Sequence, residues 1–220
     1  MRKANKIKAI LYDLDGVLVD ACDWHYHSLN RALKEVVGYD ISREDHLLTF
    51  NGLPTNTKLE MLDVRGSDAR DIWRKKQEYT VDVIKEMATP TEEKMILHEE
   101  TKSMGIISCC VTNSINMTAE LMLKKTDQLK YMQFIVANED VNNNKPHPEV
   151  YNQSIDNKNK KILAIGDNLN TDIRGANFLN YDSLLISNGI HRNEIKNKGI
   201  QDVAKEYEVI VNYIQSELKW

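Results

Sequence analysis

The chain has 220 residues, of which 41% are apolar and 28% are charged, and its formal net charge is −4. This composition is typical of a globular protein with one domain, or with a core domain and a smaller insert. The dispersed lysines and arginines argue against nucleic acid as a partner, and no apolar run approaches the roughly 18 residues that cross a membrane. An odd number of cysteines, three, argues against a disulfide framework and favours the cytoplasm as the location.

Nearly continuous apolar runs predict five strands that are buried on both faces of a sheet. These runs are residues 7–15, 106–113, 133–138, 160–168 and 181–187. Helical patterns lie between them, at 92–105, 114–125, 147–155 and 170–179, and Ser114 is a candidate N-cap of the second. Because strands alternate with helices, we expect an α/β fold, with a Rossmann-like parallel sheet and helices on both of its faces.

Residues 19–90 break this alternation, because they contain helical periodicity and no convincing buried strand. Two apolar stripes at helical spacing carry the prediction: Leu29, Ala32, Leu33, Val36 and Val37, and then Ile72, Trp73, Thr80, Val83 and Met87. We therefore expect an α/β core domain formed by residues 1–18 and 91–220, and a helical second domain at 19–90.

Polar side chains stand where several predicted strands end. Asp13 and Asp15 end the first, Thr112 and Asn113 the second, and Asp167 the fourth, with Asp172 five residues later and Lys145 in a loop before a helix. Open α/β sheets bind ligands at the carboxyl ends of their strands. The sequence therefore predicts one site built from these side chains.

The residue types in this site indicate phosphate chemistry. In a strand, Asp13 and Asp15 would lie on one side, and such carboxylates repel each other unless one is protonated or a cation lies between them. Oxygen ligands of this kind suit Mg²⁺, and a lysine, a hydroxyl and backbone N–H groups suit phosphate. Asp-Gly is also a common turn pair, but matching residues after two later strands favour an active site.

These motifs resemble those of the haloacid dehalogenase superfamily of phosphotransferases, over essentially the whole chain. They are the DxD motif in "DLDGV" (13–17), a threonine in "CCVTN" (109–113), a lysine in "NKPHPEVY" (144–151) and an acidic pair in "IGDNLNTD" (165–172).

The resemblance implies a role for each of these residues. Asp13 becomes an aspartyl phosphate and Asp15 is the general acid and base. Thr112 contacts phosphate, with Asn113 beside it, and Lys145 neutralises charge. The Mg²⁺ ligands would be Asp13, the main-chain carbonyl of Asp15 and Asp167, supported by Asp172. Because dehalogenases lack the second aspartate of DxD, Asp15 argues against dehalogenation.

The helical insert resembles the cap of the β-phosphoglucomutase and phosphoglycolate phosphatase group, in which a histidine corresponds to His25. This histidine would orient Asp15 or contact substrate, or serve only in packing or capping. Lys76 lies on the second apolar stripe, where it would contact the substrate or extend its amine into water. The segment "FNGLPTNTKLEML" (50–62) lacks the arginine that the mutases use on a second phosphate, although Lys58 lies there.

The sequence therefore predicts a Mg²⁺-dependent phosphatase that hydrolyses a small phosphorylated metabolite, such as a sugar phosphate, as a monomer or homodimer without a membrane or nucleic-acid partner. A phosphomutase of the β-phosphoglucomutase type is the first alternative. A phospho-accepting receiver-like domain and a non-catalytic binding protein are the others.

Overall fold

The computed structural model describes residues 7–51, 53–154 and 161–219, and its internal contacts divide the chain into two units. Unit 1 comprises Met1–Asp20 and Thr89–Trp220, and unit 2 comprises Ala21–Ala88. The chain thus crosses between the units twice, after Asp20 and after Ala88. No helix in the described part of the chain is long and apolar enough to cross a membrane.

Unit 1 contains a six-stranded parallel sheet in the order β3-β2-β1-β4-β5-β6. The strands are β1 (Ala9–Tyr12), β2 (Ile107–Val111), β3 (Phe134–Val136), β4 (Ile162–Gly166), β5 (Asp182–Ile186) and β6 (Tyr213–Gln215). Every residue of β1 and β4 is buried, as expected for the middle of a covered parallel sheet. The five predicted strands are all present in shortened form, and β6 was not predicted.

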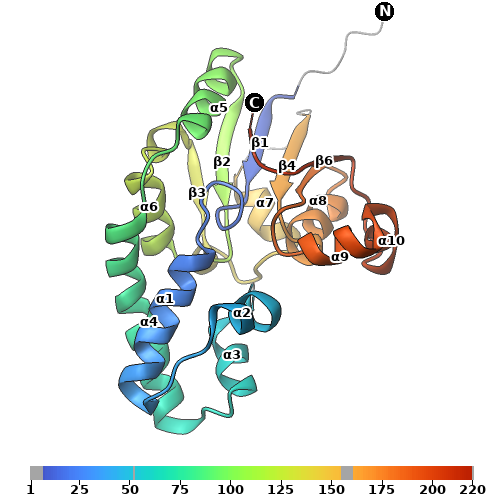
Figure 1. Ribbon diagram of the computed structural model, residues 1–220. Helices are drawn as coiled ribbons and strands as arrows, with labels where there is room; N and C mark the ends of the chain where they lie inside the picture. Colours follow the sequence, from blue (N-terminus) through green and yellow to red (C-terminus); the bar gives the residue numbers. More distant parts are fainter. Residues whose placement is uncertain (1–6, 52, 155–160, 220) are drawn as a thin grey trace, which may run out of the picture. The chain divides into compact units, whose positions relative to one another are not determined.

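Helices cover both faces of this sheet. They are α5 (Glu92–Ser103), α6 (Asn116–Lys125), α7 (Pro148–Ser154), α8 (Arg174–Phe178), α9 (Arg192–Lys198) and α10 (Ile200–Glu206). Figure 1 shows α5 and α6 on one side of the strands and α7 to α10 on the other. A π-helical turn, Leu169–Ile173, leads from β4 into α8. The predicted Rossmann-like α/β fold is confirmed.

The regular elements in the described residues of unit 2 are all helices. Unit 2 contains α1 (Cys22–Val37), α2 (Arg43–Asp45), a π-helical turn (His46–Phe50), α3 (Thr55–Met61) and α4 (Gly66–Met87). Leu29, Ala32 and Leu33 of α1 pack with Ile72 of α4 in one apolar cluster. Trp73, which the predicted stripe placed in this core, is instead 44% exposed, because it lies one helical step round from the buried Ile72.

Candidate active site

The first residues after three neighbouring strands form the centre of the site. Asp13 follows β1, Thr112 follows β2 and Asp167 follows β4. Because β2, β1 and β4 are adjacent and parallel, these residues lie together at the carboxyl edge of the sheet. The predicted convergence of strand-end side chains therefore follows from the strand order.

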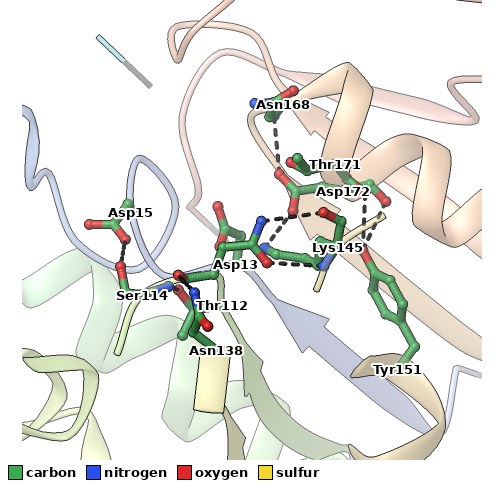
Figure 2. Close-up of polar contacts among 11 residues, drawn as sticks. Asp13, Asp15, Thr112, Ser114, Asn138, Lys145, Tyr151, Asn168, Thr171 and Asp172 are labelled. Carbon is green, nitrogen blue, oxygen red and sulfur yellow. Dashed lines mark hydrogen bonds and ion pairs between the residues drawn. The ribbon is translucent and has the colours of Figure 1, made fainter. Parts of the chain in front are cut away.

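Lys145 connects two of the carboxylates. Its Nζ lies 2.6 Å from Asp13 Oδ1 and 2.6 Å from Asp172 Oδ1, and its side chain is 3% exposed. Figure 2 shows the lysine side chain reaching both aspartates. Tyr151 lies behind this pair, where its hydroxyl donates to the carbonyl of Asp172 at 3.3 Å. The buried ammonium group of Lys145 is thus shared by two carboxylates that lie far apart in the sequence.

Asp15 has a different environment from Asp13. Strand β1 ends at Tyr12, so the strand alternation that the prediction assumes does not extend to these two aspartates. The hydroxyl of Ser114 donates to Asp15 Oδ2 at 2.7 Å, and the N–H of Ser114 donates to Thr112 Oγ1 at 3.0 Å (Figure 2). The Thr112 hydroxyl hydrogen can then donate to a ligand.

Ser114 does not cap α6, contrary to the prediction from sequence. The residue that precedes the helix is Ile115, which makes no side-chain cap. The Glu139 carboxylate instead accepts from the Asn116 N–H at 2.9 Å. With another acceptor present at the helix start, Ser114 is available for the aspartate.

Asn113 holds the main chain of the Lys145 loop. Its Oδ1 accepts from the Lys145 N–H at 3.0 Å, and its Nδ2 donates to the Lys145 carbonyl at 3.4 Å. The amide is therefore used to position the lysine, and the predicted contact of Asn113 with phosphate stays a prediction.

Main-chain groups and glycines hold the acidic pair after β4. The N–H of Asn168 donates to Asp172 Oδ2 at 3.1 Å, and the N–H of Ile190 donates to Asp167 Oδ2 at 3.3 Å. A Cβ atom at Gly189 would lie 2.3 Å from Asp167 Oδ2, which is too close for any side chain. The loop after β5 thus approaches Asp167 so closely that only glycine fits there.

Burial and mutual repulsion perturb these groups. Burial, followed by the charge of Asp172, raises the pKa of Asp13 to about 7, although Lys145 opposes the shift. Burial and the charges of Asp13 and Asp172 also raise the pKa of Asp167 well above its usual range. Burial lowers the pKa of Lys145, but the two aspartates outweigh this effect and hold it well above its ordinary value. The lysine is therefore charged, and the carboxylates have an excess of negative charge.

This arrangement fits a divalent cation. One oxygen from each of Asp13, Asp167 and Asp172 lies within 4.8 Å of the others. Three buried carboxylates against one lysine leave unbalanced negative charge, which the raised pKa values of Asp13 and Asp167 reflect. Carboxylate oxygens are hard ligands that suit Mg²⁺. Asp13, Asp167 and Asp172 could thus hold such an ion, and the predicted contribution of Asp15 stays a prediction.

The two predicted residues of the insert lie in unit 2. His25 is in α1 and Lys76 is in α4, and both are half-buried. The carbonyl of Lys76 accepts from the Thr80 hydroxyl at 2.7 Å. Their predicted contacts with Asp15 and with substrate stay predictions.

Sequence reasoning missed the groups that support the site. The sequence predicts that Ser114 is a helix N-cap, and no sequence pattern indicates a role for the loop that contains Gly189 and Ile190. This loop directly follows the predicted strand at 181–187. Because open α/β sheets bind ligands at the carboxyl ends of their strands, the loop's position could have indicated a role in the site. It was missed because Ile190 acts through its main-chain N–H, which no side-chain pattern reveals.

Known proteins share this fold. The model of the family described as "Haloacid dehalogenase-like hydrolase" matches residues 10–186. The chain belongs to the haloacid dehalogenase-like hydrolase family. The match contains every predicted motif residue, from Asp13 to Asp172.

Individual relatives and solved structures are each less than 30% identical to this chain. A pyrophosphatase PpaX from Anoxybacillus flavithermus is 29% identical over 167 residues, which cover 74% of this chain and 75% of the relative. A β-phosphoglucomutase from Clostridium difficile shares the fold with a TM-score of 0.67 and 23% identity, over 92% of this chain and 98% of the other. CbbY from Rhodobacter sphaeroides, as a mutant in complex with xylulose-(1,5)-bisphosphate, has a TM-score of 0.75 at 18% identity, over 96% and 95% of the chains. The prediction of a phosphatase-type hydrolase of this family is confirmed.

Proposed function

We propose that this haloacid dehalogenase-like phosphatase hydrolyses a small phosphorylated metabolite through an aspartyl phosphate on Asp13, with Mg²⁺ as cofactor. The observation that carries the proposal is the joining of Asp13, Lys145 and Asp172 by two 2.6 Å contacts beside Asp167. A nucleophilic carboxylate, a fixed cation and further carboxylates are the groups that transfer of a phosphoryl group from a monoester requires.

The first half-reaction forms the covalent intermediate. A carboxylate oxygen of Asp13 attacks phosphorus, the bond from phosphorus to the leaving oxygen breaks, and protonated Asp15 gives its proton to that oxygen. Thr112 and Lys145 would bind the phosphoryl oxygens and offset their charge. Mg²⁺, held by Asp13, the Asp15 carbonyl, Asp167 and Asp172, would supply further neutralisation of charge when bound.

The second half-reaction regenerates the enzyme. Asp15, now ionised, accepts a proton from water as the water oxygen attacks the phosphorus of the aspartyl phosphate. The bond between phosphorus and Asp13 breaks, and inorganic phosphate is released. The Ser114 hydroxyl donates to Asp15 Oδ2, which stabilises the ionised form of Asp15 that this step requires.

The helical unit 2 is an argument for a small substrate. We propose that its helices serve as a cap, which excludes bulk water during the reaction, and that His25 and Lys76 contribute to the choice of substrate. A sugar phosphate or a similar organic phosphate is the class proposed. The three cysteines, none of which forms a disulfide in the described part of the chain, support the cytoplasm as the place of this activity.

Release of inorganic phosphate from a panel of sugar, nucleotide and small-acid phosphates, with pyrophosphate included, tests the proposal. We expect release that requires Mg²⁺, stops with chelator and is lost in Asp13→Asn. Activity that survives in Asp13→Asn would contradict the covalent mechanism. Interconversion of hexose phosphates that depends on a sugar bisphosphate, without release of phosphate, would instead identify a phosphomutase.

A further inference from the structure

The DxD motif continues into a tight loop, residues 14–19, which we call the Asp15 loop. The Leu14 carbonyl accepts from the N–H groups of Leu18 and Val19, at 2.9 and 3.0 Å, and the Gly16 N–H donates to the Val19 carbonyl at 2.8 Å. Gly16 has a φ of +79°, a left-handed conformation that favours glycine. The loop therefore has a defined shape of its own, and Asp15 is part of it.

Two side chains from distant segments bind successive carbonyls of this loop. Lys94 Nζ, from the first turn of α5, donates to the carbonyl of Val17 at 2.6 Å. Gln128 Nε2, from the segment after α6, donates to the carbonyl of Leu18 at 2.9 Å. The bonds within the loop use the carbonyls of Leu14 and Val19, so these two contacts add anchors from outside it.

Gln128 is itself held in one orientation. It is 1% exposed, and its Nε2 also donates to Thr126 Oγ1 at 2.9 Å. Its Oε1 lies 2.9 Å from Nε2 of the buried His98, whose ring stacks on Tyr131 at 5.0 Å. Burial lowers the pKa of His98, so its ring is neutral with one N–H, which the amide oxygen accepts. The amide nitrogen is thereby directed to the loop.

Lys94 binds main-chain carbonyls. Besides the Val17 carbonyl, its Nζ donates to the carbonyl of Leu218 near the C-terminus, at 3.2 Å. Burial lowers the pKa of Lys94 to about 8, and the charges of Glu217 and Glu93 only partly oppose this shift. A lysine is seldom withdrawn from water without a carboxylate at its amine. Here the amine of Lys94 joins the Asp15 loop to the C-terminal segment.

We propose that Lys94 and Gln128 are positioning residues that fix the Asp15 loop and so hold Asp15 within reach of the leaving-group oxygen. This inference rests on the proposed role of Asp15 as the general acid. A misplacement of about 1 Å, even by a change far from the chemistry, can cost about 10²-fold in rate. The loop carries the proton donor and also the Asp15 carbonyl, which is a proposed Mg²⁺ ligand, so the assays use saturating Mg²⁺. The loss that remains should then depend on how much the leaving group needs a proton.

Two substrates separate this role from a general structural one. The nitrophenolate of p-nitrophenyl phosphate leaves without a proton, whereas the alkoxide of an alkyl phosphate requires one. We would measure kcat/KM, which reports formation of the aspartyl phosphate, for the wild type, Lys94→Met, Gln128→Met and Asp15→Asn. Lys125→Met, at an exposed lysine that ends α6, is the control. Circular dichroism spectra check that each variant is folded.

We expect Asp15→Asn to lose about 10²–10⁴-fold on the alkyl phosphate and much less on p-nitrophenyl phosphate. Lys94→Met and Gln128→Met should show the same selectivity. In each variant the loss of kcat/KM on the alkyl phosphate should be about tenfold larger than the loss on p-nitrophenyl phosphate. Lys94→Arg, which keeps a donor, should recover part of it, and Lys125→Met should match the wild type. If either Met variant does not fold, the milder Lys94→Gln and Gln128→Asn replace it.

The other outcomes overturn distinct claims. Equal losses on both substrates, or no loss, in the Lys94 and Gln128 variants would overturn the positioning role while leaving the proposed function intact. An Asp15→Asn variant without leaving-group selectivity would show that Asp15 is not the acid, and the inference would fail with it. A wild type that releases phosphate from neither of these substrates nor any member of the panel would overturn the proposed function and hence this inference also.

Discussion

Lys145 is the residue on which the charge balance of the site depends. It is the partner of both Asp13 and Asp172, and its side chain is 3% exposed. Removing one member of a buried ion pair leaves an uncompensated charge, which costs about 3–5 kcal/mol. We therefore expect Lys145→Met to lower the free energy of unfolding by about this amount in chelator, as measured by urea denaturation, and to abolish phosphate release.

An exposed ion pair provides the control for Lys145→Met. Lys161 lies 2.9 Å from Asp182, but the two side chains are 38% and 28% exposed, and such pairs contribute only about 0–1 kcal/mol. Lys161→Met should leave both stability and activity nearly unchanged. Equal losses in the two variants would contradict the assignment of a special role to the buried lysine.

The positions of Asp13, Thr112 and Asp167 could be predicted because each directly follows a strand, whereas Lys145 lies in a loop before α7 and was assigned to the site by its chemistry. The ends of adjacent parallel strands meet, and acidic, hydroxyl and amine groups there are seldom accidental. Ser114 could not be predicted in the same way, because a serine before a helical pattern fits an N-cap equally well. Only the contact between its hydroxyl and Asp15 decides between the two roles.

At the scale of elements, the loop after β5 supports the acidic segment after β4. His191 is buried, its Nε2 accepts from the Leu169 N–H at 3.1 Å, and its Nδ1 lies 2.7 Å from Glu194 Oε2. Because Nε2 is the acceptor, the ring proton is assigned to Nδ1. Leu169 begins the π-helical turn that carries Asp172, and the neighbouring Ile190 binds Asp167.

His191→Phe should weaken the binding of Mg²⁺. The substitution leaves the buried Leu169 N–H without its acceptor, at a cost of about 1–3 kcal/mol, and loosens the segment that presents Asp172. We expect a higher Mg²⁺ concentration for half-maximal activity and a smaller rise of the unfolding temperature on addition of Mg²⁺. His191→Gln, whose amide oxygen can accept the same N–H, should be closer to the wild type. Equal effects of Phe and Gln would show that the hydrogen bond is unimportant.

The elements differ in how well the sequence reveals them. The four interior strands, β2, β1, β4 and β5, are apolar runs, and burial on both faces makes such runs necessary. Strand β6 is three residues long at the edge of the sheet, and Tyr213 and Ile214 are exposed, so it has no such signature. Its pairing with β5 depends on the chain returning to that edge, which local sequence does not encode.

For the whole molecule, the raised pKa of Asp13 makes the stability of the metal-free protein depend on pH. The group titrates near 3.8 in a model compound and near 7 in the folded chain. Between these values the folded state binds a proton that the unfolded state has lost, so the stabilisation is complete below about pH 4 and is lost as the pH rises through 7. The slope for one group is at most about 1.4 kcal/mol per pH unit.

Thermal unfolding in chelator and in Mg²⁺ should therefore have opposite trends between pH 5.5 and 8. In chelator we expect the ionisation of Asp13 to lower the unfolding temperature as the pH rises. The decrease should be about 2–4 °C for each kcal/mol lost from the free energy of unfolding. Mg²⁺ binds the ionised carboxylates, so its stabilising effect should grow over the same range. Asp13→Asn removes the titrating group and should flatten the dependence in chelator. A dependence equally steep in Asp13→Asn would mean that the proton is bound elsewhere, with Asp167, whose pKa is also raised, as the next residue to substitute.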